Sequence, residues 1–177
     1  MSDIMTRSAC EHALRRLASG DMGALEIIYD KLGKRIYLLA YSILGDTHAA
    51  EDVMQETFVR ICEKAPALRD GGNAIAYILS VTRNLSIDLL RHRRWEVPCE
   101  ELTAVGSGDG SDGGDSIPFS SLEALGLLNM EERQIVTLKI EAGLRHREIA
   151  NMLGISQAAC EKRYRRALEK LKDYYRE

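Results

Sequence analysis

The chain has 177 residues, and 24 Lys and Arg against 27 Asp and Glu give it a formal net charge of −3. This balance excludes binding to nucleic acid through overall positive charge, so such a surface would need Arg and Lys clustered on one face. No stretch approaches the roughly 18 apolar residues that a membrane span requires, and the N-terminus lacks the apolar segment of a signal peptide. Both features predict a cytoplasmic protein without membrane insertion.

The four cysteines and four histidines are widely scattered and form no C-x-x-C pair or metal-ligand spacing. Reduced thiols that pack as small apolar groups are the expected state, most clearly for Cys62 and Cys160. The sequence also lacks a recognisable nucleophile–base pair and a phosphate-binding loop. We therefore predict a protein that is not an enzyme and that has no metal site and no cofactor.

Apolar residues recur at steps of three and four along most of the chain, and sustained polar–apolar alternation is missing, which predicts an all-α fold. The helices expected in the first part of the chain span residues 9–19, 22–44, 48–65 and 74–94. Those expected in the second part span residues 119–127, 130–142, 146–153 and 157–174. The three prolines, Pro66, Pro98 and Pro118, all fall where a helix is expected to have ended.

The helix expected over AEDVMQETFVRICEKA (50–65) has an apolar side and an acidic, polar side. The polar side carries Asp52, Gln55 and Glu56 at helical spacing. These residues could bind a basic partner or could form a solvated surface, and taken alone they favour the solvated surface.

The stretch SVTRNLSIDLLRHRRW (80–95) concentrates five basic residues, counting His92, on one expected helix. Its apolar residues form a broad side that leaves Arg83, Asn84 and Arg91 free to project elsewhere. Arginine suits phosphate binding and base stacking, and asparagine offers a donor and an acceptor that suit a base edge. Asn84 by itself is more often a surface or capping amide than a base reader.

Residues 96–118 separate two parts of different composition, because they contain six acidic residues and no basic residue. Within them VGSGDGSDGGDS (105–116) is almost entirely Gly, Ser and Asp, which predicts a flexible linker. The expected organisation is therefore a first domain of residues 1–95, an acidic linker of residues 96–118 and a second domain of residues 119–177.

The second domain contains the most specific local pattern, REIANMLGISQAACEKRYRRALEKL (147–171). A short helix, a turn at Gly154, an N-cap at Ser156 and a longer helix predict a helix-turn-helix. The outer face of the second helix carries Glu161, Lys162 and Arg165, groups that can bind phosphates and base edges. The alternative is an ordinary amphipathic helix with a solvated face, but the coincidence of the turn with the basic face favours DNA binding.

From about Gly20 onward, the chain resembles an extracytoplasmic-function (ECF) sigma factor. The resemblance rests on four segments in this order: AEDVMQETF, YILSVTRNLSIDLLRHRR, the acidic linker and NMEERQIVTLKIEAGLRHREIANMLGISQAACEKRYRRALEKL. The resemblance implies that the first domain binds core RNA polymerase and opens the −10 promoter element. It also implies that the second domain reads the −35 element in double-stranded DNA, and that an anti-sigma factor is a partner.

The resemblance also assigns site residues. The polymerase-binding set is Asp52, Gln55 and Glu56, which match positions that contact the clamp helices of the largest polymerase subunit. The set for single-stranded −10 DNA is Arg83, Asn84, Arg91, Arg93 and Arg94, with the loop from Ala67 to Asn73 helping to capture an extruded base. The −35 set is Arg147, Gln157, Lys162, Arg163, Arg165 and Arg166.

The chain also departs from the pattern of the family. Tyr77 stands where a Trp is usual, and Ala159, Cys160 and Glu161 replace the common start of the recognition helix, so the promoter sequence is not predicted. Two other hypotheses remain open: a stand-alone helix-turn-helix regulator that binds operators as a dimer, and a sigma-like protein that sequesters an anti-sigma factor.

Overall fold

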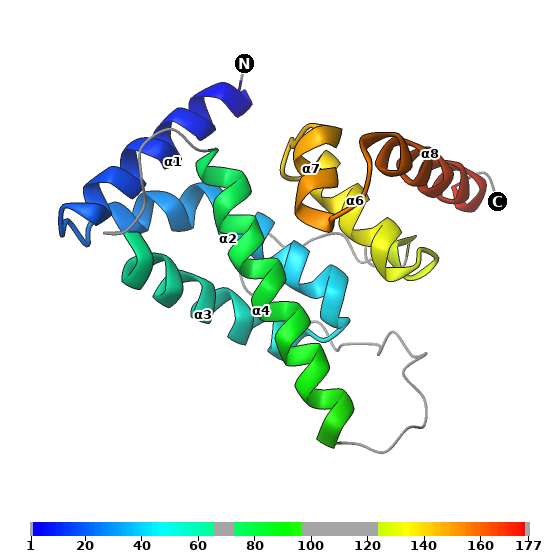
Figure 1. Ribbon diagram of the computed structural model, residues 1–177, viewed down its shortest axis with the longest axis horizontal. Helices are drawn as coiled ribbons and strands as arrows, with labels where there is room; N and C mark the ends of the chain where they lie inside the picture. The colour runs from blue at the N-terminus through cyan, green and yellow to red at the C-terminus, as the bar shows by residue number, and fades with distance from the viewer. Residues whose placement is uncertain (1, 66–72, 97–123, 176–177) are drawn as a thin grey trace.

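The structure, a computed structural model, describes residues 2–65, 73–96 and 124–175, and the side chains of residues 5–65, 73–93 and 124–175. These ranges consist of helices and short turns without a strand, so the predicted all-α fold is confirmed. The helices are α1 (Ser2–Ala18), α2 (Ala24–Leu44), α3 (Thr47–Lys64), α4 (Ala74–Glu96), α6 (Met130–Ile140), α7 (His146–Leu153) and α8 (Gln157–Tyr174) (Figure 1).

Most helix boundaries lie within two residues of the predicted ones. The exception is α1, which begins at Ser2, whereas the sequence predicted a start at residue 9. Residues 2–8 contain no Pro or Gly, so the helix propagates through them at little cost, even though Met5 remains 72% exposed. The predicted helix at 119–127 lies mostly outside the described residues, and its residues 124–126 are helical.

Short capping motifs set the ends of the helices. α2 ends at Gly45, whose left-handed backbone (φ 66°) lets its N–H donate to the Tyr41 carbonyl. Asp46 then caps α3, because its carboxylate accepts a hydrogen bond from the Ala49 N–H at 2.7 Å. Asn129 and Glu132 form a capping box at the start of α6.

The predicted helix-turn-helix is formed by α7 and α8. Gly154 ends α7 in the left-handed region (φ 68°), and the Ser156 hydroxyl accepts a hydrogen bond from the Ala159 N–H at the start of α8. Ile149 and Cys160 are fully buried where the two helices meet. The turn therefore fixes the angle at which α8 leaves α7.

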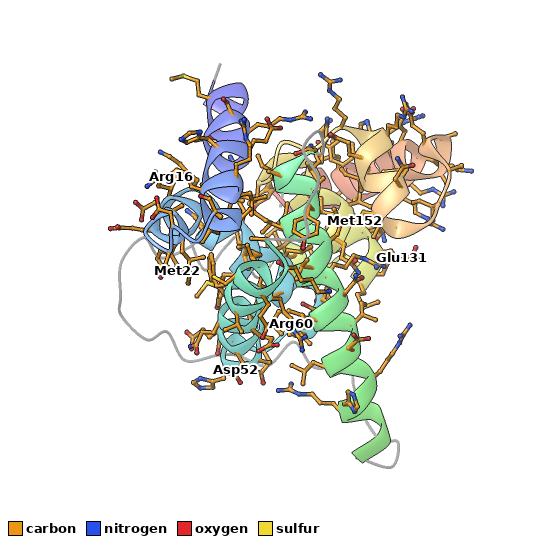
Figure 2. All side chains as sticks on the ribbon, turned by 60° about the vertical axis from the view of Figure 1, so that its left-hand side comes forward. Arg16, Met22, Asp52, Arg60, Glu131 and Met152 are labelled. Carbon is orange, nitrogen blue, oxygen red and sulfur yellow. The ribbon has the colours of Figure 1, made fainter. Side chains whose placement is uncertain are left out.

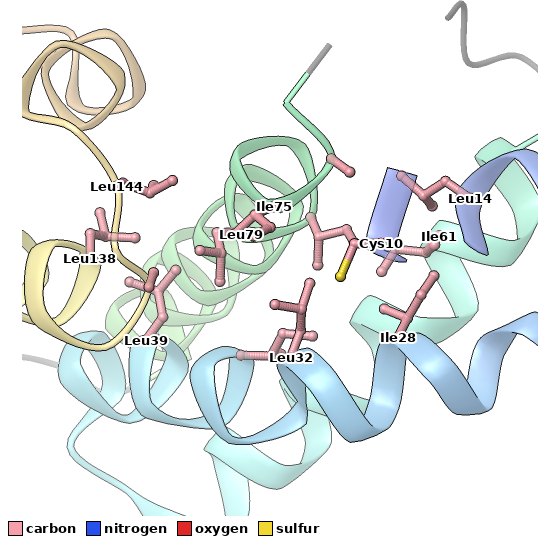
Figure 3. Close-up of a cluster of buried hydrophobic side chains, with 14 of the residues drawn as sticks. Cys10, Leu14, Ile28, Leu32, Leu39, Ile61, Ile75, Leu79, Leu138 and Leu144 are labelled. Carbon is pink, nitrogen blue, oxygen red and sulfur yellow. The ribbon is translucent and has the colours of Figure 1, made fainter. Parts of the chain in front are cut away.

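One hydrophobic cluster runs through the described part of the molecule. It joins Cys10 and Leu14 of α1, Ile28, Leu32 and Leu39 of α2, Ile61 of α3, Ile75 and Leu79 of α4, and Leu138 and Leu144 of the second part of the chain (Figure 3). A smaller cluster of Leu128, Val136 and Ala167 holds α6 against α8. The core therefore extends from the first part of the chain into the second.

The second part of the chain lies directly on the first. α6 packs on α2, and α7 approaches the N-terminal end of α4, whereas the C-terminal part of α4 projects past them (Figure 1). The predicted acidic linker of residues 96–118 lies, except for Glu96, outside the described residues. Among the helices in the described ranges, none is long and apolar enough to cross a membrane.

Gly154 and Gly33 give opposite predictions for the same substitution. Gly154→Ala should lower the free energy of unfolding by about 1 kcal/mol, because alanine is strained at φ 68° although nothing lies within 4 Å of the added Cβ. Gly33→Ala should raise it by about 0.5–1 kcal/mol, because Gly33 is helical and the added Cβ meets the Tyr29 ring only at 3.9 Å. Urea denaturation measures both, and a stabilised Gly154→Ala protein would contradict the turn geometry.

Candidate nucleic-acid and polymerase interfaces

The predicted polymerase-binding residues lie together on the outer face of α3. Asp52 and Gln55 are exposed, and the partly exposed Glu56 accepts a hydrogen bond from the Arg60 Nε at 2.8 Å. The opposite side of the helix holds Val53 and Ile61 in the protein interior. Figure 2 shows Asp52 and Arg60 on α3, on the other side of α4 from Glu131 and Met152 of the second domain. This acidic face is open to a large partner.

The predicted −10 residues on α4 do not share one face. Asn84 is exposed, and Arg91, seven residues further on, lies on the same stripe of the helix and forms a 3.6 Å ion pair with Asp88. Arg93 points toward α3 and lies 3.8 Å from Asp46, the N-cap of that helix. The side chain of Arg94 and residues 67–72 of the predicted base-capturing loop lie outside the described residues.

Arg83 differs from the other predicted −10 residues because it faces the second domain. Its side chain is half-buried, and its Nε donates a hydrogen bond to the Gln134 Oε1 of α6 at 3.0 Å. Burial lowers the pKa of the Arg83 guanidinium, and the nearby Arg91 acts in the same direction. The structure therefore places Arg83 in a contact between α4 and α6, which the sequence did not predict.

Most of the predicted −35 residues form an exposed basic surface on α8. Lys162, Arg165 and Arg166 are exposed on one side of the helix, and Gln157 is exposed at its N-terminal end. The Gln157 amide donates a hydrogen bond to Glu161 at 2.8 Å, one turn along. This surface combines three cations with an amide at a helix start, a composition that suits phosphates and a base edge.

Arg163 and Arg147 lie apart from that surface. Arg163 is half-buried and turned toward α6, where its Nη1 lies 3.1 Å from a Glu131 carboxylate oxygen. Arg147 is exposed on α7, the first helix of the motif. Of the two, only Arg147 is presented to solvent without a described ion pair.

Several polar residues of α6 matter to these surfaces and were missed by the sequence analysis. Gln134, only 1% exposed, binds Arg83, and Glu131 pairs with Arg163. Glu132, also buried, accepts two hydrogen bonds from the Lys170 Nζ at 2.7 and 2.9 Å and so joins α6 to α8. The sequence did contain an indication for Gln134. It lies beside the apolar Ile135 and Leu138 on one helix face, and a polar residue in such a place implies a buried hydrogen-bond partner.

The described cysteines are unreactive groups in the core. Burial raises the pKa of the Cys10 thiol to about 11, and burial also raises the pKa values of Cys62 and Cys160. Such thiols stay protonated near neutral pH and are poor nucleophiles and metal ligands. Cys10 and Cys160 are fully buried and Cys62 is partly buried, in line with the predicted packing role.

Comparisons with known proteins match two separate parts of the chain. The model of Sigma-70 region 2 matches residues 28–96, and the model of Sigma-70, region 4 matches residues 122–171. α4 thus ends the first match, and the helix-turn-helix lies within the second.

Two curated relatives and one solved structure resemble the chain over most of its length. The chain is 28% identical over 165 residues to the probable RNA polymerase sigma factor RfaY of Xanthomonas campestris pv. campestris. This alignment covers 88% of this chain and 41% of RfaY. The chain is 32% identical over 168 residues to the ECF RNA polymerase sigma factor SigE of Mycolicibacterium smegmatis. This alignment covers 89% of this chain and 65% of SigE. The chain therefore spans less than two thirds of the length of both relatives.

The solved structure supports the fold. The sigma factor RpoE of Bartonella quintana, solved in complex with the anti-sigma factor NepR, superposes with a TM-score of 0.65 at 20% identity and covers 84% of this chain and 96% of RpoE. The two sigma-70 regions in this order, with an exposed basic helix in the second, lead to one conclusion: the chain belongs to the ECF family of RNA polymerase sigma factors.

Proposed function

We propose that this chain binds core RNA polymerase in the cytoplasm and directs it to promoters, acting by binding rather than as an enzyme. Residues 1–95 form the domain that engages polymerase and opens the −10 element, residues 96–118 are the linker, and residues 119–177 form the domain that reads the −35 element. The observation that carries the proposal is the order of the two sigma-70 regions, with the basic helix α8 exposed in the second.

The −35 element binds to α8. In helix-turn-helix proteins the second helix enters the major groove, and residues near its N-terminus contact base edges. Gln157 lies at this end and offers an amide to a base, while Lys162, Arg165 and Arg166 neutralise phosphates. Arg147 adds a cation from α7. Arg163 contributes once its ion pair with Glu131 opens.

The opened −10 strand binds along α4. A single strand exposes bases and phosphates together, so its binding surface needs cations for the backbone and polar or stacking groups for the bases. Asn84 and Arg91 share one exposed stripe and supply both kinds of group. Arg83 joins them when it is free of Gln134, and Arg93 and Arg94 continue the positive charge toward the end of the helix.

The acidic face of α3 binds the polymerase. Asp52, Gln55 and Glu56 are presented on the side of α3 away from the core, and a carboxylate surface of this kind suits a basic partner. An anti-sigma factor is the second proposed protein partner, a proposal supported by the RpoE complex with NepR and by the shared fold.

Transcription from a pool of promoter fragments, with purified bacterial core polymerase with and without this chain, tests the proposed function. Specific transcripts that depend on the chain are expected. Core binding without transcripts from any fragment would favour a protein that sequesters an anti-sigma factor. Failure to bind core polymerase, together with tight dimeric binding to duplex DNA, would overturn the proposal in favour of a stand-alone regulator.

Reversing the charge of the acidic face of α3 should strongly weaken polymerase binding. The triple variant Asp52→Lys, Gln55→Ala, Glu56→Lys should weaken the affinity for core polymerase by roughly 30–100-fold, because attractive charge pairs become repulsive. The control Glu26→Lys with Asp30→Lys produces the same change in net charge, four units, at exposed positions of α2. Fluorescence anisotropy with labelled core polymerase measures both. Equal affinities for the two variants would contradict the assignment of this face.

Removing the Asn84 amide should impair promoter opening more than promoter binding. Asn84→Ala is expected to reduce open-complex formation by roughly 10-fold and closed-complex affinity by less than about 2-fold, because the amide contacts a base only after the strands separate. Permanganate footprinting reports open complexes, and filter binding at low temperature reports closed ones. Asn151→Ala removes an exposed amide from α7 and should leave the ratio of open to closed complexes unchanged. Equal losses in both assays for Asn84→Ala would indicate a structural role.

A further inference from the structure

One acidic residue lies within the basic surface of α8. Glu161 is partly exposed, one turn after Gln157 and one turn before Arg165, and Lys162 is exposed beside it. α8 lies at the edge of the molecule with α6 and α7 on one side of it, so this surface is open to duplex DNA (Figure 1). A carboxylate here repels the phosphates that the neighbouring cations attract. Its presence in a DNA-binding surface therefore calls for a partner, either a cation of this chain or a donor on the DNA.

The cations of the chain do not neutralise Glu161. Arg165 occupies the i+4 position that favours an ion pair with a preceding glutamate on a helix. However, none of the ion pairs that α8 forms within the described ranges includes Glu161. Glu161 instead accepts a hydrogen bond from the Gln157 amide at 2.8 Å. The carboxylate is therefore directed toward the N-terminal end of α8, and the exposed Lys162 and Arg165 remain available for phosphates.

The start of α8 allows a close approach to base pairs. In a helix-turn-helix, the N-terminal residues of the second helix contact base edges in the major groove. Ala158 is exposed at this end of α8, and its side chain ends at Cβ, so it does not hold the helix away from the bases. The longer side chains of Gln157 and Glu161 meet beside it. The hydrogen-bonded pair therefore lies at the end of α8 that contacts bases in this motif.

The pair of Gln157 and Glu161 presents acceptors to the groove. One carboxylate oxygen of Glu161 accepts from Gln157, which leaves the second oxygen free to accept from DNA. Cytosine offers an amine at N4 in the major groove, whereas guanine and thymine offer acceptors that a carboxylate repels. Adenine has an amine at N6, but its N7 acceptor lies next to that amine. A carboxylate is therefore matched best by cytosine.

We propose that Glu161 is a specificity-determining residue of the −35 interface: its carboxylate, held by Gln157, accepts a hydrogen bond from the N4 amine of one cytosine. The inference rests on the proposed function, because it assumes that α8 reads duplex DNA. Lys162 and Arg165 bind the phosphates, and the Gln157 amide oxygen remains for a neighbouring base. At a sequence without cytosine in this place, the carboxylate only repels the DNA. One group thus favours the correct sequence and disfavours the others.

Selection from a pool of promoter fragments with a randomised −35 region identifies this cytosine. Core polymerase carrying the full-length chain retains the bound fragments, and core polymerase alone gives the background. The parent chain should enrich a motif with a fixed C·G pair. Glu161→Ala should lower the preference at that pair by about 10-fold and leave the other positions unchanged. Glu169→Ala is the matched control, because it removes an exposed carboxylate from α8 about two turns further along, and it should select the parent motif.

Methylation of the selected cytosine tests the contact at a single atom. N4-methylcytosine keeps its pairing with guanine but carries a methyl group in place of the hydrogen that points into the major groove. This base should reduce the affinity of the parent complex for the selected fragment by about 10-fold, measured by fluorescence anisotropy with a labelled fragment. The affinity of the Glu161→Ala complex should change by less than about 2-fold, because that complex has already lost the acceptor. The Glu169→Ala complex should respond as the parent does.

Each contrary result has a separate meaning. If the parent and Glu161→Ala chains select the same motif with the same preferences, or if Glu161→Ala raises the affinity for all fragments equally, Glu161 does not read a base. The inference is then refuted, although the assignment of α8 to the −35 element stands. A preference lost at a pair other than C·G, or equal sensitivity of the two complexes to N4-methylcytosine, also refutes it. If the parent chain binds core polymerase but selects no −35 sequence, the assignment of α8 itself fails, and the inference fails with it.

Discussion

The apolar face of α6 is the constraint on which the arrangement of the molecule depends. Ile135 and Leu138 cannot remain in water without cost, and α2 and α4 supply the surface that covers them. Burying this face sets where the second domain lies and therefore which basic residues stay exposed. The same packing turns α8 outward, because Leu128, Val136 and Ala167 hold α6 between the first domain and the recognition helix.

The charges of the chain are divided among these surfaces in a way that the net charge of −3 conceals. Acidic residues face outward from α3, basic residues face outward from α8, and α4 carries a mixed stripe between them. Arg83 and Arg163 are two basic residues that the fold turns inward, each toward α6. Under the proposed function, exposed cations bind DNA directly, whereas these two become available only after a contact with α6 opens.

Local chemistry made much of this fold predictable from the sequence. Helical periodicity and the turn at Gly154 are decided within a few residues, and both were predicted. The docking of α6 on α2 was not, because periodicity identifies the buried side of a helix but not the distant helix that covers it. For the same reason the partners of Arg83, Arg93 and Arg163 could not be predicted, since each lies more than thirty residues away along the chain.

Under the proposed function, we expect the docked arrangement of the free chain to open when the chain engages a promoter. Promoter elements one helical turn apart lie about 35 Å apart along DNA, and under the proposed function α4 and α8 bind separate elements. The most direct measurement is the distance between dyes on α3 and α8, placed by chemistry that spares thiols, in the free chain and in the complex with core polymerase and promoter DNA. We expect one short distance in the free chain and a longer one in the complex. An unchanged distance would contradict the opening of the docked state at promoters.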